Sequence, residues 1–316
     1  MAITDFRDDT LEEINSLLSS DMTVEVTKTK TVPHANDPAI TFPNIDGGTI
    51  KCKLIETAVL YVDLRRSTEL SLEHKPQTVA KLYSAFVRSM TRCARYHGGH
   101  VRGIIGDRVM VIFDSDKAAT KAVHTAELMN SVIKHQLDEA FKNNDVKCGI
   151  GIDYGRILVA KTGIRRNGHE SHNYKSLVWL GRPANVASKL TDAANKHVHS
   201  SKPKIVEGFH HPHTSLTWGP EIDVNTFLDR LSPTYLNNQL THTEKDFRAF
   251  IQTNEYFNET VPPILMTKPV YDLYKSENES AKSVTSGWWT KIKSVKVPGY
   301  SGVIYGGDVV FSAFTA

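Results

Sequence analysis

Residues 61–68, Tyr-Val-Asp-Leu-Arg-Arg-Ser-Thr, decide how this chain of 316 residues is read. They close a β-branched and apolar run, so residues 57–64 are predicted to form a buried strand that ends beside a carboxylate, Asp63. A second decisive segment, residues 101–113, has Gly106-Asp107 at its centre, in a tight turn between two predicted strands. A sheet that brings these two aspartates together would build one site from both segments.

The pattern of the surrounding chain predicts a β-α-β-β-α-β order, followed by further elements. This order is typical of the ferredoxin-like arrangement, an α+β fold in which an antiparallel sheet carries helices on one face. The predicted elements are strand 57–64, a turn or short helix 67–74, helix 77–97, strands 100–105 and 108–113, helix 117–143, a hairpin of 147–153 and 156–162 that turns at Tyr154-Gly155, strand 176–180, helix 182–195, strand 263–267, helix 268–275, and closing strands 288–297 and 302–311.

Two regions interrupt this pattern and set the predicted domain organisation. Residues 1–50 are interpreted as an N-terminal extension with a short helix at 9–18 and no catalytic role. Residues 51–316 are interpreted as one domain with an insertion at about 196–260, where His, Pro, Thr and Asn are frequent and periodicity is weak.

The composition limits the possible classes of protein. The apolar fraction of 40% and the charged fraction of 23% are ordinary for a globular protein. The net charge of +3 gives no support to nucleic-acid binding. Long apolar runs and signal-peptide features are lacking, so we expect no membrane association. Cys52, Cys93 and Cys148 lack metal-ligand spacing and favour a reducing, cytoplasmic location.

Asp63 and Asp107 are candidate ligands of divalent cations. Mg²⁺ and Mn²⁺ prefer oxygen ligands, and two carboxylates with the carbonyl of Leu64 form a reasonable set. Ser67 and Thr68 are predicted to open a helix whose free N–H groups suit phosphate. The alternative remains open, because aspartate in a Gly-Asp turn is also common turn chemistry.

Four segments resemble the motifs of class III nucleotide cyclases. The segment at 63–68 resembles their first metal-binding motif and the segment at 106–113 their second. Residues 149–157 are similar to their next hairpin, and residues 181–190 to their transition-state helix. A late strand and helix at 264–274 also fit, and all motifs stand in the family's order.

The resemblance implies a role for each matching residue. Asp63 and Asp107 would bind two metal ions with help from the Leu64 carbonyl, and Asn185 would orient the ribose. Lys189 stands where the family usually has an arginine that stabilises charge on the reacting phosphate; lysine keeps the charge but loses the planar fork. A lysine near the last hairpin, Lys296 or Lys293, would contact the terminal phosphate.

The departures from the family concern the base. Its two usual purine-reading positions are Gly103 and Val178 here, and neither side chain can make the usual base contacts. Tyr61 replaces the usual phenylalanine before the first metal aspartate. With further donors nearby, the pattern resembles the pyrimidine cyclases of bacterial antiphage signalling (Pycsar systems), and two uracil carbonyls favour UTP over CTP. The predicted nucleotide-binding residues are Tyr61, Arg65, Arg66, Ser67, Thr68, Arg102 and Lys296.

The resemblance therefore implies a cyclase that converts UTP, or less favourably CTP, to the 3′,5′-cyclic monophosphate and pyrophosphate with two Mn²⁺ or Mg²⁺ ions. In the family, the metal aspartates and the Asn-helix residues come from different subunits, so we expect a homodimer with sites at the interface. A separate effector protein would read the product. Two alternatives remain: an adenylate cyclase with an atypical base pocket, and a non-catalytic nucleotide-binding regulatory module.

Overall fold

The computed structural model describes residues 2–42, 49–141, 146–162, 165–166, 169–170, 176–210, 215–234 and 239–315. The chain divides into two compact units. The first comprises Met1–Lys196 and Val261–Ala316, and the second comprises His197–Thr260. The bounds of the second unit lie close to those of the segment interpreted from the sequence as an insertion.

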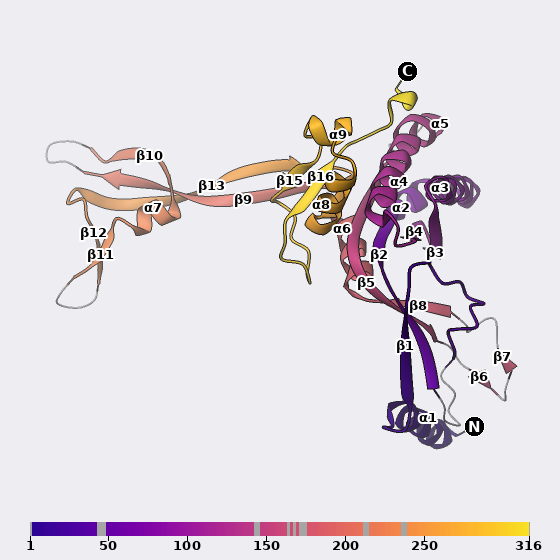
Figure 1. The fold of residues 1–316 in the computed structure, drawn as a ribbon. Coiled ribbons are helices and arrows are strands. Elements are labelled where there is room, and N and C mark those ends of the chain that lie inside the picture. The colour runs from indigo at the N-terminus through magenta and orange to yellow at the C-terminus, as the bar shows by residue number, and fades with distance from the viewer. Residues whose placement is uncertain are drawn as a thin grey trace. The chain divides into compact units, whose positions relative to one another are not determined.

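The first unit is built on one mixed sheet (Figure 1), in the strand order β15-β16-β14-β5-β2-β4-β3. Most neighbours are antiparallel, but β1 pairs with β2, and β14 with β5, in parallel. The predicted α+β class is thus confirmed, with a sheet that is not purely antiparallel. The strands are β1 (Thr23–Thr29), β2 (Thr49–Leu64), β3 (Gly99–Ile105), β4 (Arg108–Phe113), β5 (Cys148–Thr162), β8 (Ser176–Leu180), β14 (Ile264–Thr267), β15 (Thr290–Ile292) and β16 (Ile304–Gly307).

One face of the sheet is covered by α3 (Pro76–Tyr96), α4 (Ala118–Val132) and α8 (Lys268–Glu277). The sequence dictates this packing, because apolar residues recur at helical spacing on α3 and alternate along β2. Leu60 and Val62 of β2 are buried in the same core as the helix residues, which on α3 are Leu82, Phe86, Met90 and Cys93. This is the main hydrophobic core.

Helix α6 (Arg182–Ala193) lies on the opposite face, against β5 and β2, and so differs from the predicted one-sided arrangement. Two glycines of β5 explain its position. A Cβ atom at Gly151 would overlap the backbone of Ala187 and Thr191, and one at Gly149 would lie 2.6 Å from the Thr191 carbonyl oxygen. Glycine at both positions lets the helix backbone rest directly on the strand.

The predicted hairpin with a turn at Tyr154-Gly155 is wrong, because residues 148–162 form the single strand β5. Its partner β2 is longer than predicted and begins at Thr49. The two strands stay paired from Leu64↔Cys148 to Lys53↔Val159, with Gly155 opposite Thr57. A continuous partner therefore satisfies the backbone groups where a turn was expected.

The other predicted elements of the first unit are present with shifted ends, whereas β1, β6, β7 and α9 were not predicted. Helix α2 (Ser67–Glu73) begins at the predicted residue, and the helix predicted over 117–143 ends earlier, with residues 142–143 outside the described part. The other elements are α1 (Ile3–Leu18), a π-helical turn η1 (Ile133–Leu137), α5 (Asp138–Ala140), β6 (Arg165–Arg166), β7 (His169–Glu170), α9 (Lys282–Thr285) and the 3₁₀ turn η3 (Ser312–Phe314).

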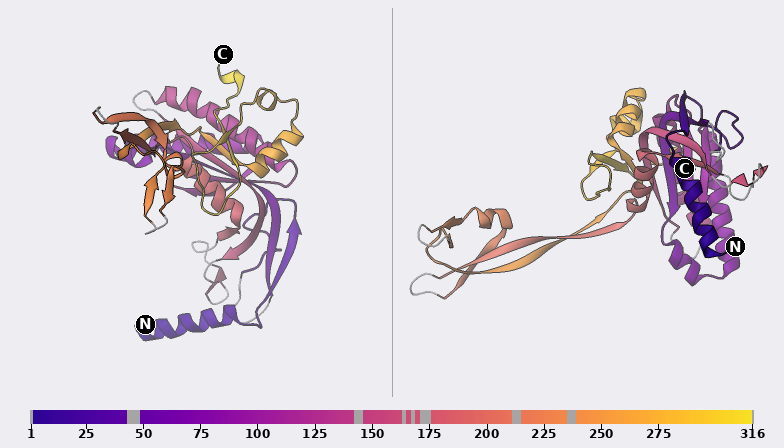
Figure 2. Two further views of the ribbon diagram at one scale, coloured as in Figure 1. Left: turned by 90° about the vertical axis from the view of Figure 1, so that its left-hand side faces the viewer. Right: turned by 90° about the horizontal axis from the view of Figure 1, so that it is seen from below.

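The second unit is organised by two long antiparallel strands, β9 (His197–Phe209) and β13 (Phe247–Thr260), which run side by side in the right-hand view of Figure 2. Strand β10 (Thr217–Asp223) adds to the edge of β9. The unit also contains α7 (Val224–Leu228), β11 (Leu231–Pro233) and β12 (Leu240–His242). Glu207, nearly buried, forms ion pairs with Arg230 and His242 in its small core.

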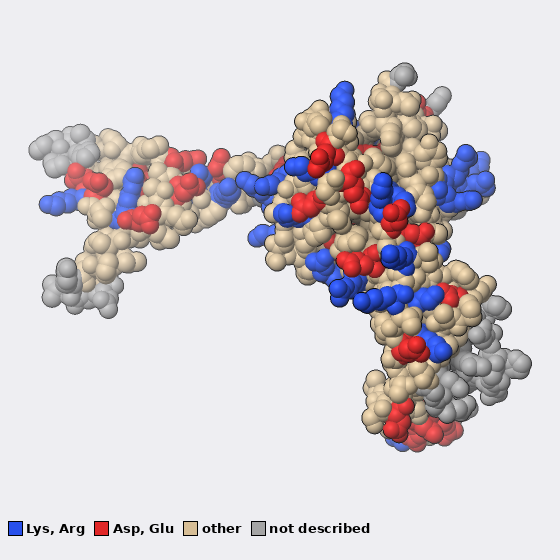
Figure 3. All heavy atoms as spheres, viewed as in Figure 1, with Lys and Arg blue, Asp and Glu red and all other residues tan. Residues whose placement is uncertain are grey.

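The distribution of charged side chains and the hydropathy of the described helices agree with the ordinary composition of the chain. On the face drawn in Figure 3, basic and acidic side chains are interspersed among the described residues. A search of the described helices finds none long and apolar enough to cross a bilayer.

The contact between α6 and β5 can be tested by adding one methyl group. We expect Gly151→Ala to lower the free energy of unfolding by about 2 kcal/mol, because overpacking forces the backbone to shift. The new Cβ would meet the helix backbone at Ala187 and Thr191. Urea denaturation measures this loss. The matched control is Gly103→Ala in β3, where the Cβ would lie an ordinary 3.5 Å from Met110. Equal stability of the two variants would contradict this account of α6.

Candidate functional site

Two carboxylates meet at one end of the sheet. Asp63 is the penultimate residue of β2, and Asp107 lies in the turn between β3 and β4. Strand pairing brings them together, because Val62 of β2 is opposite Val109 of β4, close after the turn. Gly106 has a positive φ of 61°, which a glycine adopts without strain and which allows the tight turn. The structure therefore brings together the two aspartates on which the sequence prediction depends.

The Asp107 carboxyl lies in an environment that disfavours its charge. Burial raises its pKa, and the adjacent Asp63 carboxylate raises it further, while an interaction with Ser67 lowers it. Its Oδ2 atom is buried and has no hydrogen-bond partner among the described residues. A partly buried carboxylate beside a like charge, with one buried and unpaired oxygen, is an arrangement that a bound cation would stabilise.

Arg108 forms an ion pair with Asp63. Its Nη2 lies 2.7 Å from Asp63 Oδ2 and also forms an ion pair with Asp192 of α6. Its Nη1 donates to Ser188 Oγ at 3.0 Å. The arginine thus links the first carboxylate to the last turns of α6 while Asp107 stays without a cationic partner in the described structure.

The donor set fits divalent cations with oxygen preference. It comprises two neighbouring carboxylates, one with an orphaned buried oxygen, and the backbone of Leu64 follows Asp63 directly. Within the described ranges, there is no group of three or more His, Cys, Asp or Glu side chains that could hold a metal ion. Further oxygen ligands would therefore have to come from backbone, water or a bound phosphate.

Tyr61 lies on the same face of β2 as Asp63, two residues earlier. It pairs with Met110 of β4, which in turn pairs with Gly103 of β3, so the three residues form a row across the sheet. The phenol donates to Met110 Sδ at 2.8 Å, and burial raises its pKa. Gly103 contributes no side chain to this row, and Met110 lies between it and the phenol. Val178, the other substituted position, lies on β8 opposite Ala160.

Arg65 and Arg102 have other contacts than those predicted. The buried Arg65 guanidinium donates to the Thr191 carbonyl at 2.5 Å, and burial lowers its pKa. It anchors the end of α6, which is a structural role and differs from the predicted nucleotide contact. Arg102 Nε donates to the Pro33 carbonyl at 3.0 Å, so this side chain holds residues of the N-terminal extension.

The other predicted phosphate-binding residues surround α2. Arg66 precedes the helix in the left-handed conformation, at φ 57°, and forms ion pairs with Glu69 and Glu73. Ser67 is the first helical residue and interacts with Asp107, whereas Thr68 is exposed. Ser67 is therefore the one of these three that lies against the carboxylate pair in the described structure.

Asn185 and Lys189 are exposed on consecutive turns of α6. Lys189 Nζ donates to the Pro298 carbonyl at 3.1 Å, which connects the helix to the loop between β15 and β16. Lys296, on this loop, is also exposed, as is Lys293. The described contacts join neither Asn185 nor Lys296 to the carboxylate pair of the same chain.

Sequence reasoning missed three residues of this network: Arg108, Ser188 and Asp192. Arg108 stood inside the quoted second motif, directly after Asp107. Ser188 and Asp192 are four residues apart and therefore share a helix face. That spacing was visible in the sequence, but only the packing of α6 on the glycines of β5 brings the face to Arg108.

Comparisons with known proteins agree with this geometry. Residues 52–205 match the family described as the Adenylate and Guanylate cyclase catalytic domain. A protein of Burkholderia cepacia named uridylate cyclase is 30% identical over 177 residues, which cover 54% of this chain and 72% of that protein. A uridylate cyclase of Xanthomonas perforans is 32% identical over 173 residues, covering 53% and 69%.

Among solved structures, the adenylyl cyclase CyaB from P. aeruginosa aligns with a TM-score of 0.50 at 19% identity. The alignment covers 81% of this chain and 95% of that one, and it supports the fold. The family match spans the carboxylate pair and helix α6. From its sequence and its fold, the chain belongs to the class III nucleotide cyclases, a family of phosphorus–oxygen lyases.

Proposed function

We propose that the chain is a uridylate cyclase, which converts UTP to 3′,5′-cyclic UMP and pyrophosphate. The observation that carries the proposal is the site itself: a partly buried carboxylate pair with one orphaned, buried oxygen, two residues from a phenol whose hydroxyl donates to a thioether sulfur. The names of the similar proteins from Burkholderia cepacia and Xanthomonas perforans support the choice of base.

Asp63 and Asp107 would hold two Mn²⁺ or Mg²⁺ ions, with the Leu64 carbonyl as a further ligand. When bound, such ions neutralise the triphosphate and lower the pKa of the ribose 3′-hydroxyl, which attacks the α-phosphorus. Arg108 Nη2 forms ion pairs with both Asp63 and Asp192. When Asp63 binds a cation, Arg108 would release Asp63 and keep its ion pair with Asp192.

Tyr61 would read the base. In the described structure its phenol donates to a thioether sulfur, which is a weak acceptor. A uracil carbonyl is a stronger acceptor, so the hydroxyl can exchange partners at little cost. Gly103 has no side chain, and a Cβ there would lie 3.5 Å from Met110, the partner of the phenol. Arg65 and Arg102 have other contacts, so Tyr61 is the polar group on which recognition of the base would depend.

The site would be completed by a second copy of the chain. Asn185 and Lys189 are exposed on α6 and would orient the ribose and the reacting phosphate of the partner subunit's site. Lys296, exposed on the loop that Lys189 contacts through Pro298, would add charge for the terminal phosphate. A twofold dimer would contain two equivalent sites.

A role in antiphage defence rests on the resemblance to Pycsar cyclases. The product would act through a separate effector protein in the cytoplasm. The three cysteines, all buried and free, are compatible with a reducing compartment. Phage plaque counts on cells that carry the chain or its Asp107→Asn variant measure this role directly.

Cation binding can be measured without turnover. We expect Mn²⁺ to stabilise the wild-type protein by about 2.7 kcal/mol at a hundredfold excess over its Kd. The Asp107→Asn variant should lose most of this gain in a thermal melt, because it removes the oxygen that lacks a partner. Asp116→Asn, which changes an exposed carboxylate, is the control and should respond as wild type. Undiminished stabilisation of Asp107→Asn would place the cation elsewhere.

Substrate identity is tested with the four ribonucleoside triphosphates and Mn²⁺, followed by mass identification of the cyclic product. We expect cyclic UMP to dominate. Tyr61→Phe should lower kcat/KM for UTP about tenfold or more, because it removes one hydrogen bond to the base. Tyr271→Phe, on the opposite face of the sheet, is the matched control. Cyclic AMP as the main product, or full activity of Tyr61→Phe, would refute the assignment.

If each active site is formed by residues of two subunits, two different inactive variants should complement each other. Co-expressed Asp107→Asn and Asn185→Ala chains should recover about a quarter of wild-type activity, since half the dimers are mixed and each has one intact site of two. Cyclic product formation measures the recovery. Asp63→Asn with Asp107→Asn is the control, because both damage the same half-site and should stay inactive. A mixture of Asp107→Asn and Asn185→Ala without activity would mean that one chain supplies both halves, or that the protein is a non-catalytic module.

A further inference from the structure

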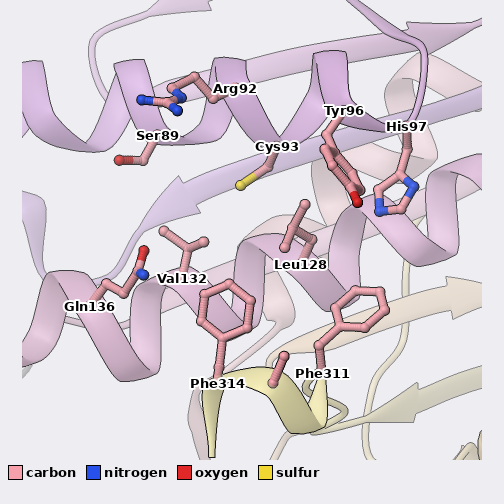
Figure 4. Close-up of a pocket in the computed structure, with 11 residues that line it drawn as sticks. Ser89, Arg92, Cys93, Tyr96, His97, Leu128, Val132, Gln136, Phe311 and Phe314 are labelled. Carbon is pink, nitrogen blue, oxygen red and sulfur yellow. The ribbon is translucent and has the colours of Figure 1, made fainter.

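A cavity of about 660 Å³ lies between α3, α4 and the C-terminal segment that contains η3 (Figure 4). It is on the face of the sheet covered by α3 and α4, whereas Tyr61 and Asp63 belong to the face covered by α6. The cavity is therefore separate from the candidate nucleotide site. Its volume lies within the range of cavities that enclose small organic ligands.

The middle of the cavity is apolar. Cys93 of α3 faces Leu128 and Val132 of α4, and Phe311 and Phe314 close the side formed by the C-terminal segment. Such a wall suits an acyl chain or an aromatic ring, because burial of its surface removes apolar area from water.

The two ends of the cavity are polar and differ from each other. Ser89, Arg92 and Gln136 lie at one end in Figure 4. Arg92 is exposed, and among the described residues it has no ion-pair partner, so its guanidinium is available for an anionic group. His97 lies at the other end, and its Nε2 atom is buried without a hydrogen-bond partner in the described structure. Burial and the neighbouring His124 lower the pKa of His97 to about 4, so this end is uncharged at neutral pH.

The wall formed by α4 has an irregular backbone. Two lining residues belong to this part of the helix: Val132 directly precedes the π-helical turn η1 (Ile133–Leu137), and Gln136 lies within it. A π-helical turn inside a helix costs regular hydrogen bonding and is frequent at functional sites. Its presence in the cavity wall is a second observation, independent of the volume, that points to a ligand.

We propose that this cavity binds a small apolar monocarboxylate, with the carboxylate on Arg92 and the acyl or aromatic body between α3 and α4. A neutral ligand would leave Arg92 unpaired, and a strongly polar one would bury hydrogen-bonding groups against the apolar wall. One cation at one end of an apolar cavity selects an amphipathic monoanion.

Binding of decanoate, below its micellar concentration, tests the proposal by calorimetric titration of the full chain without nucleotide. We expect saturable binding to wild type. Arg92→Gln should weaken it about tenfold, the loss expected for one charge-assisted hydrogen bond. Arg88→Gln is the matched control, since Arg88 is an exposed arginine one turn earlier on α3 that does not line the cavity.

Ala313→Trp is the blocking variant. Ala313 lines the cavity but is itself exposed, so the larger side chain can fill the cavity without disturbing the core. We expect it to abolish binding at an unchanged Tm. Decan-1-ol, the neutral probe, should bind wild type at least tenfold more weakly than decanoate and should not distinguish Arg92→Gln from wild type.

Three outcomes would overturn the proposal. These are decanoate binding that does not saturate, equal affinity for decanoate in the wild type and Arg92→Gln, and full affinity in Ala313→Trp. None of these measurements involves cyclase turnover, so the result is independent of the proposed uridylate cyclase activity.

Discussion

The close approach of α6 to β5 is the constraint on which the site depends. Gly149 and Gly151 leave no side chain between strand and helix, and the helix backbone therefore rests on the sheet. Arg65 then reaches from the end of β2 to the Thr191 carbonyl and fixes the end of the helix. Helix α6 carries both Asn185 and Asp192. The packing of α6 on β5 therefore determines where the polar face of the helix lies relative to Asp63.

The charge balance around Asp63 follows from that placement. Arg108 lies between one acid of the sheet and one of α6, so its two ion pairs join elements that are distant in sequence. Asp107 shares the burial but none of this positive charge, and its pKa is raised. Two adjacent, partly buried carboxylates, one with an unpaired oxygen, do not favour stability. The unfavourable arrangement is understandable if cations occupy the site during function.

Sequence patterns could predict most elements and the carboxylate pair, because local rules govern them. The spacing along α3 and the Gly106-Asp107 turn are examples. The continuous strand β5 could not be predicted, since Gly155 reads as a turn residue unless the pairing partner β2 is known to begin at Thr49. The contacts that Arg65 and Arg102 make within the chain could not be predicted for a similar reason. Local sequence shows a cationic side chain, but tertiary packing decides which acceptor it meets.

The N-terminal extension has a larger part in the site than its composition indicated. Val32 and Ile40 are buried in the same cluster as Met110, against which Tyr61 packs. Asp114 accepts a hydrogen bond from the Val32 backbone at 2.7 Å, and Arg102 holds the Pro33 carbonyl. The match to the cyclase family begins at residue 52, so these residues of the extension lie outside the matched segment. Tyr61 is therefore held partly by residues outside the matched segment, and its position depends on more than the motifs themselves.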